Sequence, residues 1–175
     1  MEAWQILLII IVIVLSFYLS GFFIVLTYAF DFSARLKRRI TGINVILVEK
    51  REIIVRVYER FKKEGTNFDE RFEQNLEQFL KYELKRPRFE ECKTAISLQK
   101  SLQSRLFYEF QTQTSLKNDP EIKNDCNMLE DLDRNIRTSC SLFNSDVAGY
   151  NYWINIFGYR WLFYLLRKKP MPAIV

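Results

Sequence analysis

The chain begins with a long apolar segment in which no residue from Ala3 to Phe30 is charged. Isoleucine, leucine, valine and phenylalanine dominate this run. A helix rises about 1.5 Å per residue and the hydrocarbon core of a bilayer is about 30 Å thick, so roughly 20 residues are enough to cross it. We therefore expect residues 1–30 to form a permanent transmembrane helix.

A cleaved signal sequence is the alternative interpretation of this run. Such a signal has a basic start, an apolar stretch of about 7–15 residues and a small residue before the cleavage point. No lysine or arginine precedes the run, and the run is much longer than a signal requires. Retention of the segment as an anchor is therefore favoured.

The orientation of the span follows from the basic residues near its ends. Four of them lie shortly after the run, and basic flanks remain on the cytoplasmic side. This predicts a single-pass protein of the cell inner (cytoplasmic) membrane, with the N-terminus outside and the remainder cytoplasmic. Aromatic rings also favour membrane interfaces. The interface residues expected around the span are Trp4, Tyr28, Arg35, Lys37, Arg38 and Arg39.

The composition beyond the span restricts the partners that we expect. All 26 lysines and arginines lie beyond Phe30, and the net charge of the chain is +5. A moderate basic surplus suits contact with anionic membrane lipids. Charges of both signs are mixed and no nucleic-acid-binding signature is present, so no nucleic-acid partner is expected. The three cysteines, which are Cys92, Cys126 and Cys140, are expected to be buried, reduced thiols.

A heptad-like pattern follows the span. Apolar residues alternate at spacings of four and three, which is typical of a helical bundle or coiled coil. The pattern consists of Leu36, Ile40, Ile43, Leu47, Lys50, Ile54, Val57 and Phe61. We expect one helix to continue from the span into this pattern.

Further helices are expected at 68–85, 88–116 and 120–157, the last with Asp119 as its N-cap. Four amphipathic helices with short connections predict an all-α fold, with an antiparallel four-helix bundle over residues 31–157. A long two-helix coiled coil is the alternative.

Three segments resemble the LemA family. Residues 43–54 (INVILVEKREII) are similar to its I-D-V-x-L-K-R-R-x-D-L-I block, and residues 119–123 (DPEIK) are similar to its Y-P-D-L-K segment. Residues 143–157 resemble its Y-N-x-x-V-x-x-Y-N-x-x-I-x-x-F pattern. The departures are Asn44 for Asp, Val48 for Lys and Val55 for Pro. The resemblance implies a membrane-anchored helical bundle of bacterial type and supplies no enzymatic activity.

Two aromatic–asparagine pairs, Phe143-Asn144 and Tyr150-Asn151, lie seven residues apart and so share one helix face. A half-buried asparagine offers two donors and an acceptor, which can hold helix register against a neighbouring backbone or side chain. We expect this structural role, with a ligand-binding ladder as the alternative.

The chain lacks the residues that most enzymatic sites need. It contains no histidine, and no P-loop, dinucleotide-binding turn or nucleophile elbow is present. Glu49 and Glu52 lie three residues apart on one helix, a spacing at which two carboxylates can share a metal. Lys50 and Arg51 between them instead indicate a solvated charged face. We therefore expect no enzymatic activity, no cofactor and no metal.

The C-terminal segment 158–175 combines aromatic and basic residues and is too short to cross a bilayer. Its candidate interface residues are Arg160, Trp161, Arg167, Lys168 and Lys169. Three interpretations are open: the segment lies among lipid headgroups, it caps the apolar end of the bundle, or it contacts a partner or second subunit.

These observations lead to one functional hypothesis. We expect a non-enzymatic scaffold or self-assembling interaction module, which is a homo-oligomer in the membrane and has an unidentified membrane-protein partner. A regulatory adaptor of a membrane protease or sensor enzyme is one alternative. An organiser of anionic lipid surface is another.

Overall fold

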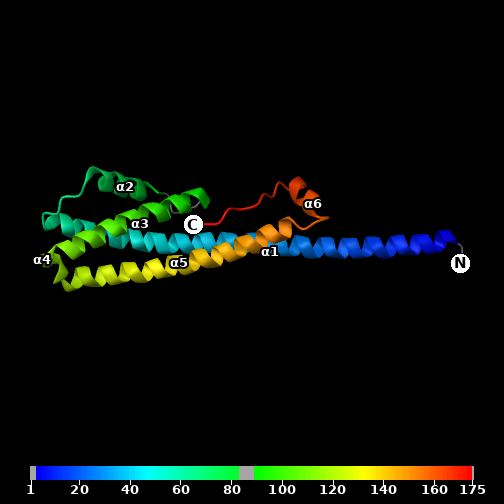
Figure 1. Cartoon of the computed structure of the whole chain (residues 1–175), viewed down its shortest axis with the longest axis horizontal. Helices are drawn as coiled ribbons and strands as arrows, with labels where there is room; N and C mark the ends of the chain where they lie inside the picture. The colour runs from blue at the N-terminus through cyan, green and yellow to red at the C-terminus, as the bar shows by residue number, and fades with distance from the viewer. Residues whose placement is uncertain (1–2, 83–88, 175) are drawn as a thin grey trace. The chain divides into compact units, whose positions relative to one another are not determined.

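The computed structural model describes residues 3–82 and 89–174 (Figure 1). Within these residues every element is helical and no strand is present, which confirms the predicted all-α class. The elements are α1 (Ala3–Lys63), α2 (Glu70–Lys81), α3 (Phe89–Thr112), α4 (Thr114–Lys117), α5 (Pro120–Ile154) and α6 (Arg160–Leu165).

The chain divides into two compact units. The terminal unit consists of Met1–Lys37 and Asn144–Ala173, and the central unit consists of Arg38–Phe143 and Ile174–Val175. This grouping differs from the three domains expected from the sequence. The apolar start of α1 shares its unit with the end of α5 and with α6, because ring contacts within the terminal unit join these segments.

The heptad-like pattern lies on α1, which continues without a break from the apolar run, as expected. Seven of the eight residues of the pattern are buried, and Ile40 is half-buried. The expected periodicity is therefore confirmed. It holds even at the one charged position, Lys50, whose side chain is fully buried.

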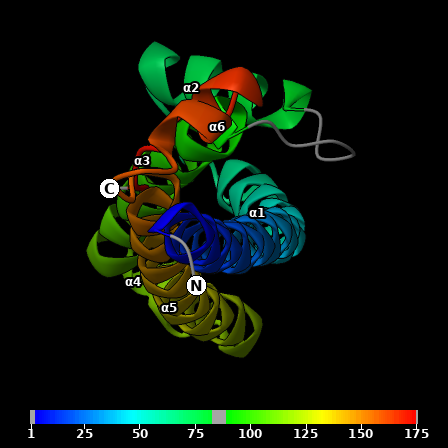
Figure 2. The same ribbon diagram turned by 90° about the vertical axis from the view of Figure 1, so that its right-hand side faces the viewer.

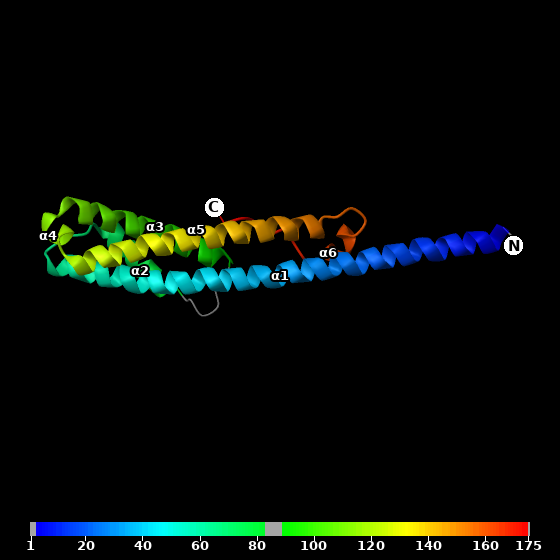
Figure 3. The same ribbon diagram turned by 90° about the horizontal axis from the view of Figure 1, so that it is seen from below.

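In the central unit, α1 contacts α2, α3 and α5 (Figures 2 and 3). Arg56 of α1 donates from Nε to the Asp125 carboxylate of α5 at 3.1 Å. A stacked pair of rings attaches α2 to α1: Phe72 of α2 stacks on Tyr58 of α1 with centroids 5.8 Å apart. Phe68, in the connection before α2, stacks on Phe72 at 4.4 Å. Apolar side chains from all four helices fill the core of the unit.

Two helices differ from their expected bounds. The second begins at Glu70, and the predicted limits at Lys85 and Arg88 lie outside the described residues. The third ends at Thr112, because Gln113 has an extended backbone that separates α3 from α4. The Thr112 hydroxyl bonds back to the carbonyls of the preceding turn, a local competition that weakens a helix at its end.

The fourth predicted helix, α5, begins as expected and ends early. Asp119 Oδ1 accepts the backbone N–H groups of Glu121 (2.8 Å) and Ile122 (3.4 Å), which confirms the N-cap. The helix ends at Ile154, and Phe157, at which we expected it to end, lies beyond it and is 100 % exposed. That expectation was wrong because the chain leaves the helix for a turn in which Gly158 has a φ of 92°.

Replacement of Asp119 by alanine should destabilise the central unit by about 1 kcal/mol, because two N–H groups of the first turn lose their acceptor. Asp119→Asn is the matched control, since asparagine caps a helix equally well. Urea unfolding of the full chain in detergent, followed by helical circular dichroism, measures both. Equal losses in the two variants would contradict the capping role.

Candidate membrane-interface site

The terminal unit contains a hydrogen-bonded cluster of three rings. The Tyr18 hydroxyl donates to the carbonyl oxygen of Gly158 (2.9 Å) and accepts from Trp161 Nε1 (3.2 Å). The Tyr159 hydroxyl donates to the carbonyl oxygen of Tyr18 (3.0 Å), and these two rings stack with centroids 5.0 Å apart. A Cβ at Gly21 would collide with the Tyr159 hydroxyl, so glycine permits this approach. The turn before α6 is thus attached to α1 near Tyr18.

The end of α5 packs on a later part of α1. Tyr28 stacks on Trp153 with centroids 4.5 Å apart and an interplanar angle of 7°. The ring of Phe32 lies against Gly149, where a Cβ would come within 2.5 Å of it. A glycine inside a helix costs about 1 kcal/mol relative to alanine. The close approach of the Phe32 ring explains why position 149 is a glycine despite this cost.

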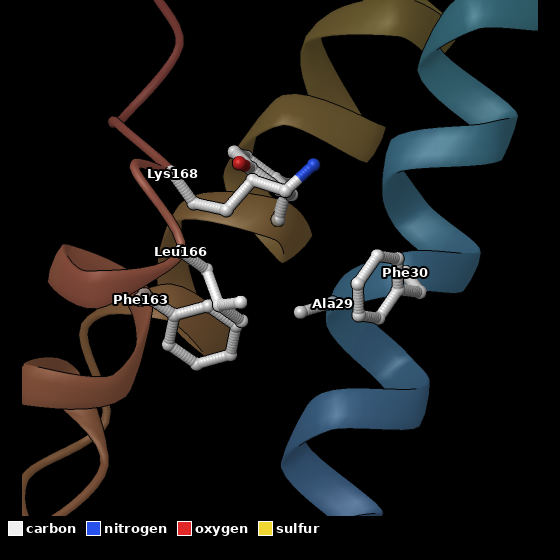
Figure 4. Close-up of a pocket in the computed structure, with 6 residues that line it drawn as sticks. Ala29, Phe30, Phe163, Leu166 and Lys168 are labelled. Carbon is white, nitrogen blue, oxygen red and sulfur yellow. The ribbon is translucent and has the colours of Figure 1, made fainter.

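An apolar crevice lies between α1, the end of α5, α6 and the residues that follow α6. Phe163 and Leu166 point toward Ala29, and Phe30 and Lys168 lie at its edge (Figure 4). The crevice leaves no room for a water molecule, and Phe163 is only 2 % exposed. Lys168 Nζ lies 5.4 Å from the centroid of the Phe30 ring, which is within the range of a cation–π contact. The crevice is therefore dry and has one positive charge at its rim.

The asparagine at the end of α5 binds the backbone of the C-terminal tail. Asn151 Nδ2 donates to the carbonyl oxygen of Met171 (2.8 Å), and Met171 N donates to Asn151 Oδ1 (2.9 Å). The side chain of Asn151 thus holds a backbone, as one of the expected structural roles requires, but the backbone belongs to the tail rather than to a neighbouring helix. Asn144 is half-buried in α5.

The terminal unit also presents a large apolar surface to its surroundings. Every side chain from Ile6 to Ser20 is exposed. Phe157, Trp161, Tyr164 and Leu165 are also exposed, Tyr164 to 84 %. Exposed apolar surface of this extent is unfavourable in water and marks a contact with a partner or a membrane.

The expected interface residues occupy several places. Trp4 is exposed at the start of α1, Tyr28 stacks on Trp153, and Arg35 pairs with Asp31 at 2.6 Å. The five C-terminal candidates lie in the same unit as these three, whereas Arg38 and Arg39 belong to the central unit. Tyr18 and Tyr159 were not among the interface residues expected from the sequence. The hydroxyl of a tyrosine inside an uncharged apolar run was the signal that would have indicated Tyr18.

A second unusual feature lies in the central unit, where Lys50 is 0 % exposed. Its Nζ donates to Gln103 Oε1 (2.7 Å) and to Asp133 Oδ1 (3.3 Å), and Gln99 also donates to Gln103 (2.9 Å). The expected solvated face over residues 49–52 is therefore wrong at Lys50. The helix period places this residue in the core, and only Glu49 and Glu52 are exposed.

Burial controls the protonation of this buried group. Removal from water lowers the pKa of Lys50 to about 8, against the opposing effect of Asp133. Burial acts to raise the pKa of Asp133, but Lys50 and Arg137 outweigh it and hold that pKa below its usual value. Arg137 Nη2 lies 2.7 Å from the Asp133 carboxylate. The buried lysine thus has a satisfied hydrogen-bonding shell and one shared counter-charge.

The three cysteines lie in the central unit. Among residues 3–82 and 89–174, no group of three His, Cys, Asp or Glu side chains is arranged to hold a metal. All three cysteines are free, Cys92 and Cys126 are buried as expected, and Cys140 is only half-buried. Burial raises the pKa of Cys92 to about 12 and that of Cys126 to about 11, so both are unreactive thiols at neutral pH.

Within the described part of the chain, α1 has the length and composition of a helix that can cross a membrane. A signal sequence meets the same test, whereas the core helix of a soluble protein would be mostly buried, and only 6 % of the apolar 18-residue window of α1 is buried. Comparisons with family models, curated proteins and solved structures find no match.

The pKa of Lys50 predicts a pH dependence of stability. Between pH 8 and 10.5 the native lysine is neutral while the unfolded lysine is still protonated, so the free energy of unfolding rises with pH in this window. Lys50→Met abolishes this titration. The free energy of unfolding of the wild type, relative to that of the variant, should therefore rise by about 3 kcal/mol between pH 7 and pH 10.5.

Urea unfolding at a series of pH values measures this difference, and the comparison cancels the contribution of the cysteines. Lys93→Met, at an exposed lysine of α3, is the control and should retain the wild-type pH dependence. The same dependence in both variants would show that Lys50 does not titrate in this window.

Proposed function

We propose that the chain is a non-enzymatic, single-pass membrane protein in which α1 crosses the bilayer and the central unit is a helical interaction module. The observation that carries the proposal is the uninterrupted exposure of uncharged side chains from Ile6 to Ser20, of which all but Ser16, Tyr18 and Ser20 are apolar. A helix satisfies its own backbone hydrogen bonds, and these side chains then require only an apolar surrounding, which a bilayer supplies.

The proposed orientation places the N-terminus outside the cell and the central unit in the cytoplasm. It is supported by the basic residues that follow the span, of which Lys37 and Arg38 are exposed on α1. Positive charges beside a span are retained on the cytoplasmic side. The inner membrane of a bacterium is the proposed location.

The proposed module is an antiparallel four-helix bundle of the LemA type, formed by the later part of α1 with α2, α3 and α5. Contacts of α1 with each of the other three helices support this arrangement. The unreactive thiols, together with the lack of histidine in the sequence, favour binding over catalysis. A module of this kind acts by association, and we propose self-assembly in the membrane plane.

The orientation predicts a labelling pattern in intact cells. A cysteine introduced by Glu2→Cys should react with a membrane-impermeant maleimide, and one introduced by Glu64→Cys, at an exposed site beyond α1, should react only after lysis. Cys140→Ala in both variants removes the half-buried thiol. Labelling of Glu64→Cys in intact cells would overturn the proposed orientation, and recovery of the protein in the soluble fraction would overturn the anchor.

Self-assembly predicts that copies lie close together at low expression. An amine-reactive cross-linker added to intact membranes should give dimers and higher species of the full chain, because exposed lysines are distributed over the central unit. Dilution of the protein with excess lipid before cross-linking is the control against chance encounters. Monomer alone at every lipid ratio would contradict the scaffold.

A further inference from the structure

We infer that the turn at residues 155–159 and the start of α6 are a re-entrant element that enters the bilayer beside α1, to the depth of Tyr18. The proposed partner of this element is the lipid bilayer itself. The inference rests on the proposed function, because Tyr18 lies inside the membrane only if α1 crosses it.

The position of Tyr18 in the apolar run fixes this depth. A span needs roughly 20 residues. Every 20-residue window between Ala3 and Phe30 contains Tyr18, and at least four residues separate it from either end of the window. At about 1.5 Å per residue, Tyr18 is therefore about 6 Å or more inside the hydrocarbon boundary. Gly158, Tyr159 and Trp161 are hydrogen-bonded to Tyr18 and lie at its level.

The chain approaches this level and then returns along α1. Gly149 lies at Phe32, Trp153 at Tyr28 and Gly158 at Tyr18, so the end of α5 runs toward the centre of the span. After the turn, Phe163 lies beside Ala29, and Lys168 lies over the ring of Phe30. Entry and exit on the same side define a re-entrant element.

Several polar groups of the turn are hydrogen-bonded within the protein. The Tyr18 hydroxyl, the Tyr159 hydroxyl and the Trp161 indole N–H all donate within the cluster. The amide of Asn155 donates to the carbonyl oxygen of Asn151 at 2.8 Å. Unsatisfied polar groups cost several kcal/mol each in hydrocarbon, and re-entrant backbone occurs where protein contacts satisfy it. The hydrogen bonds of this cluster lower the cost of placing the turn in a membrane.

The outward side chains of the element also suit lipid. Phe163 is buried against the protein, whereas Phe157, Trp161 and Leu165 are exposed, as are the apolar side chains of α1. Three of the four charges of this segment occur where headgroups are expected. Arg167, Lys168 and Lys169 follow the helix, and Lys168 lies at Phe30, the last residue of the uncharged run. Arg160 is exposed at the start of α6, and its long side chain can extend toward the headgroups.

Depth-dependent quenching of single tryptophans tests this inference on the full chain in vesicles. The variant Trp4→Phe/Trp153→Phe retains Trp161. Its fluorescence should be quenched by lipids brominated on the acyl chains and protected from aqueous iodide. Adding Tyr18→Phe to this variant should reduce the quenching by acyl bromines, because the bonds that hold Trp161 at depth are lost. Adding Tyr28→Phe, which leaves the cluster intact, should not.

A second variant, Trp153→Phe/Trp161→Phe, retains Trp4 and reports on α1 alone. If bromolipids quench Trp4 but not Trp161, the inference fails while the proposed anchor stands. If they quench neither, both fail. Quenching of Trp161 by iodide would place the element in water, and protection from both quenchers would place a second protein copy over it; either result overturns the inference.

Discussion

The hydrogen-bonded backbone of α1 is the constraint on which the rest of the structure depends. Because one uninterrupted helix runs from Ala3 to Lys63, its polar backbone groups are internally paired and only its side chains meet the surroundings. From Ile6 to Ser20 those side chains are uncharged, all but three are apolar, and all are exposed. Such a surface favours an apolar environment such as a bilayer. We propose the same environment for the C-terminal segment that packs on α1.

The central unit obeys a different constraint. Its core contains a buried lysine, Lys50, at a position where leucine would fit the heptad-like pattern, because the other positions of the pattern are apolar. Pairs of buried charges are often no more stabilising than apolar side chains of similar volume. The hydrogen bonds of Lys50 instead require Gln103 of α3 and Asp133 of α5 to lie beside it at the same level along α1. We propose that this network selects the register of three helices, at some cost in stability.

Much of the helical framework was predictable from the sequence. The apolar run, the four-and-three spacing after it and the Asp119 cap are local signals, and the structure bears them out. The periodicity also indicated the burial of Lys50. The charged neighbours Glu49 and Arg51 obscured that signal, because composition within a short window cannot reveal which single side chain faces the core.

The contacts of the C-terminal segment were beyond sequence reasoning. Phe157 fits the apolar spacing of α5, yet the helix ends before it, since spacing does not report where a turn interrupts a helix. Gly149 is a weak helix former whose purpose is visible only when Phe32 is placed against it. The cluster around Tyr18 joins residues about 140 positions apart. A single sequence carries no signal for such a pairing.

Spin labels placed one at a time along α1 test the central claim most directly. In vesicles, the accessibility of each label to oxygen relative to an aqueous nickel complex reports its depth in the bilayer. A helix that crosses predicts a single maximum of relative oxygen accessibility near the middle of the apolar run, with the nickel complex reaching labels only near its two ends. Labels open to the nickel complex throughout residues 6–20 would contradict the account.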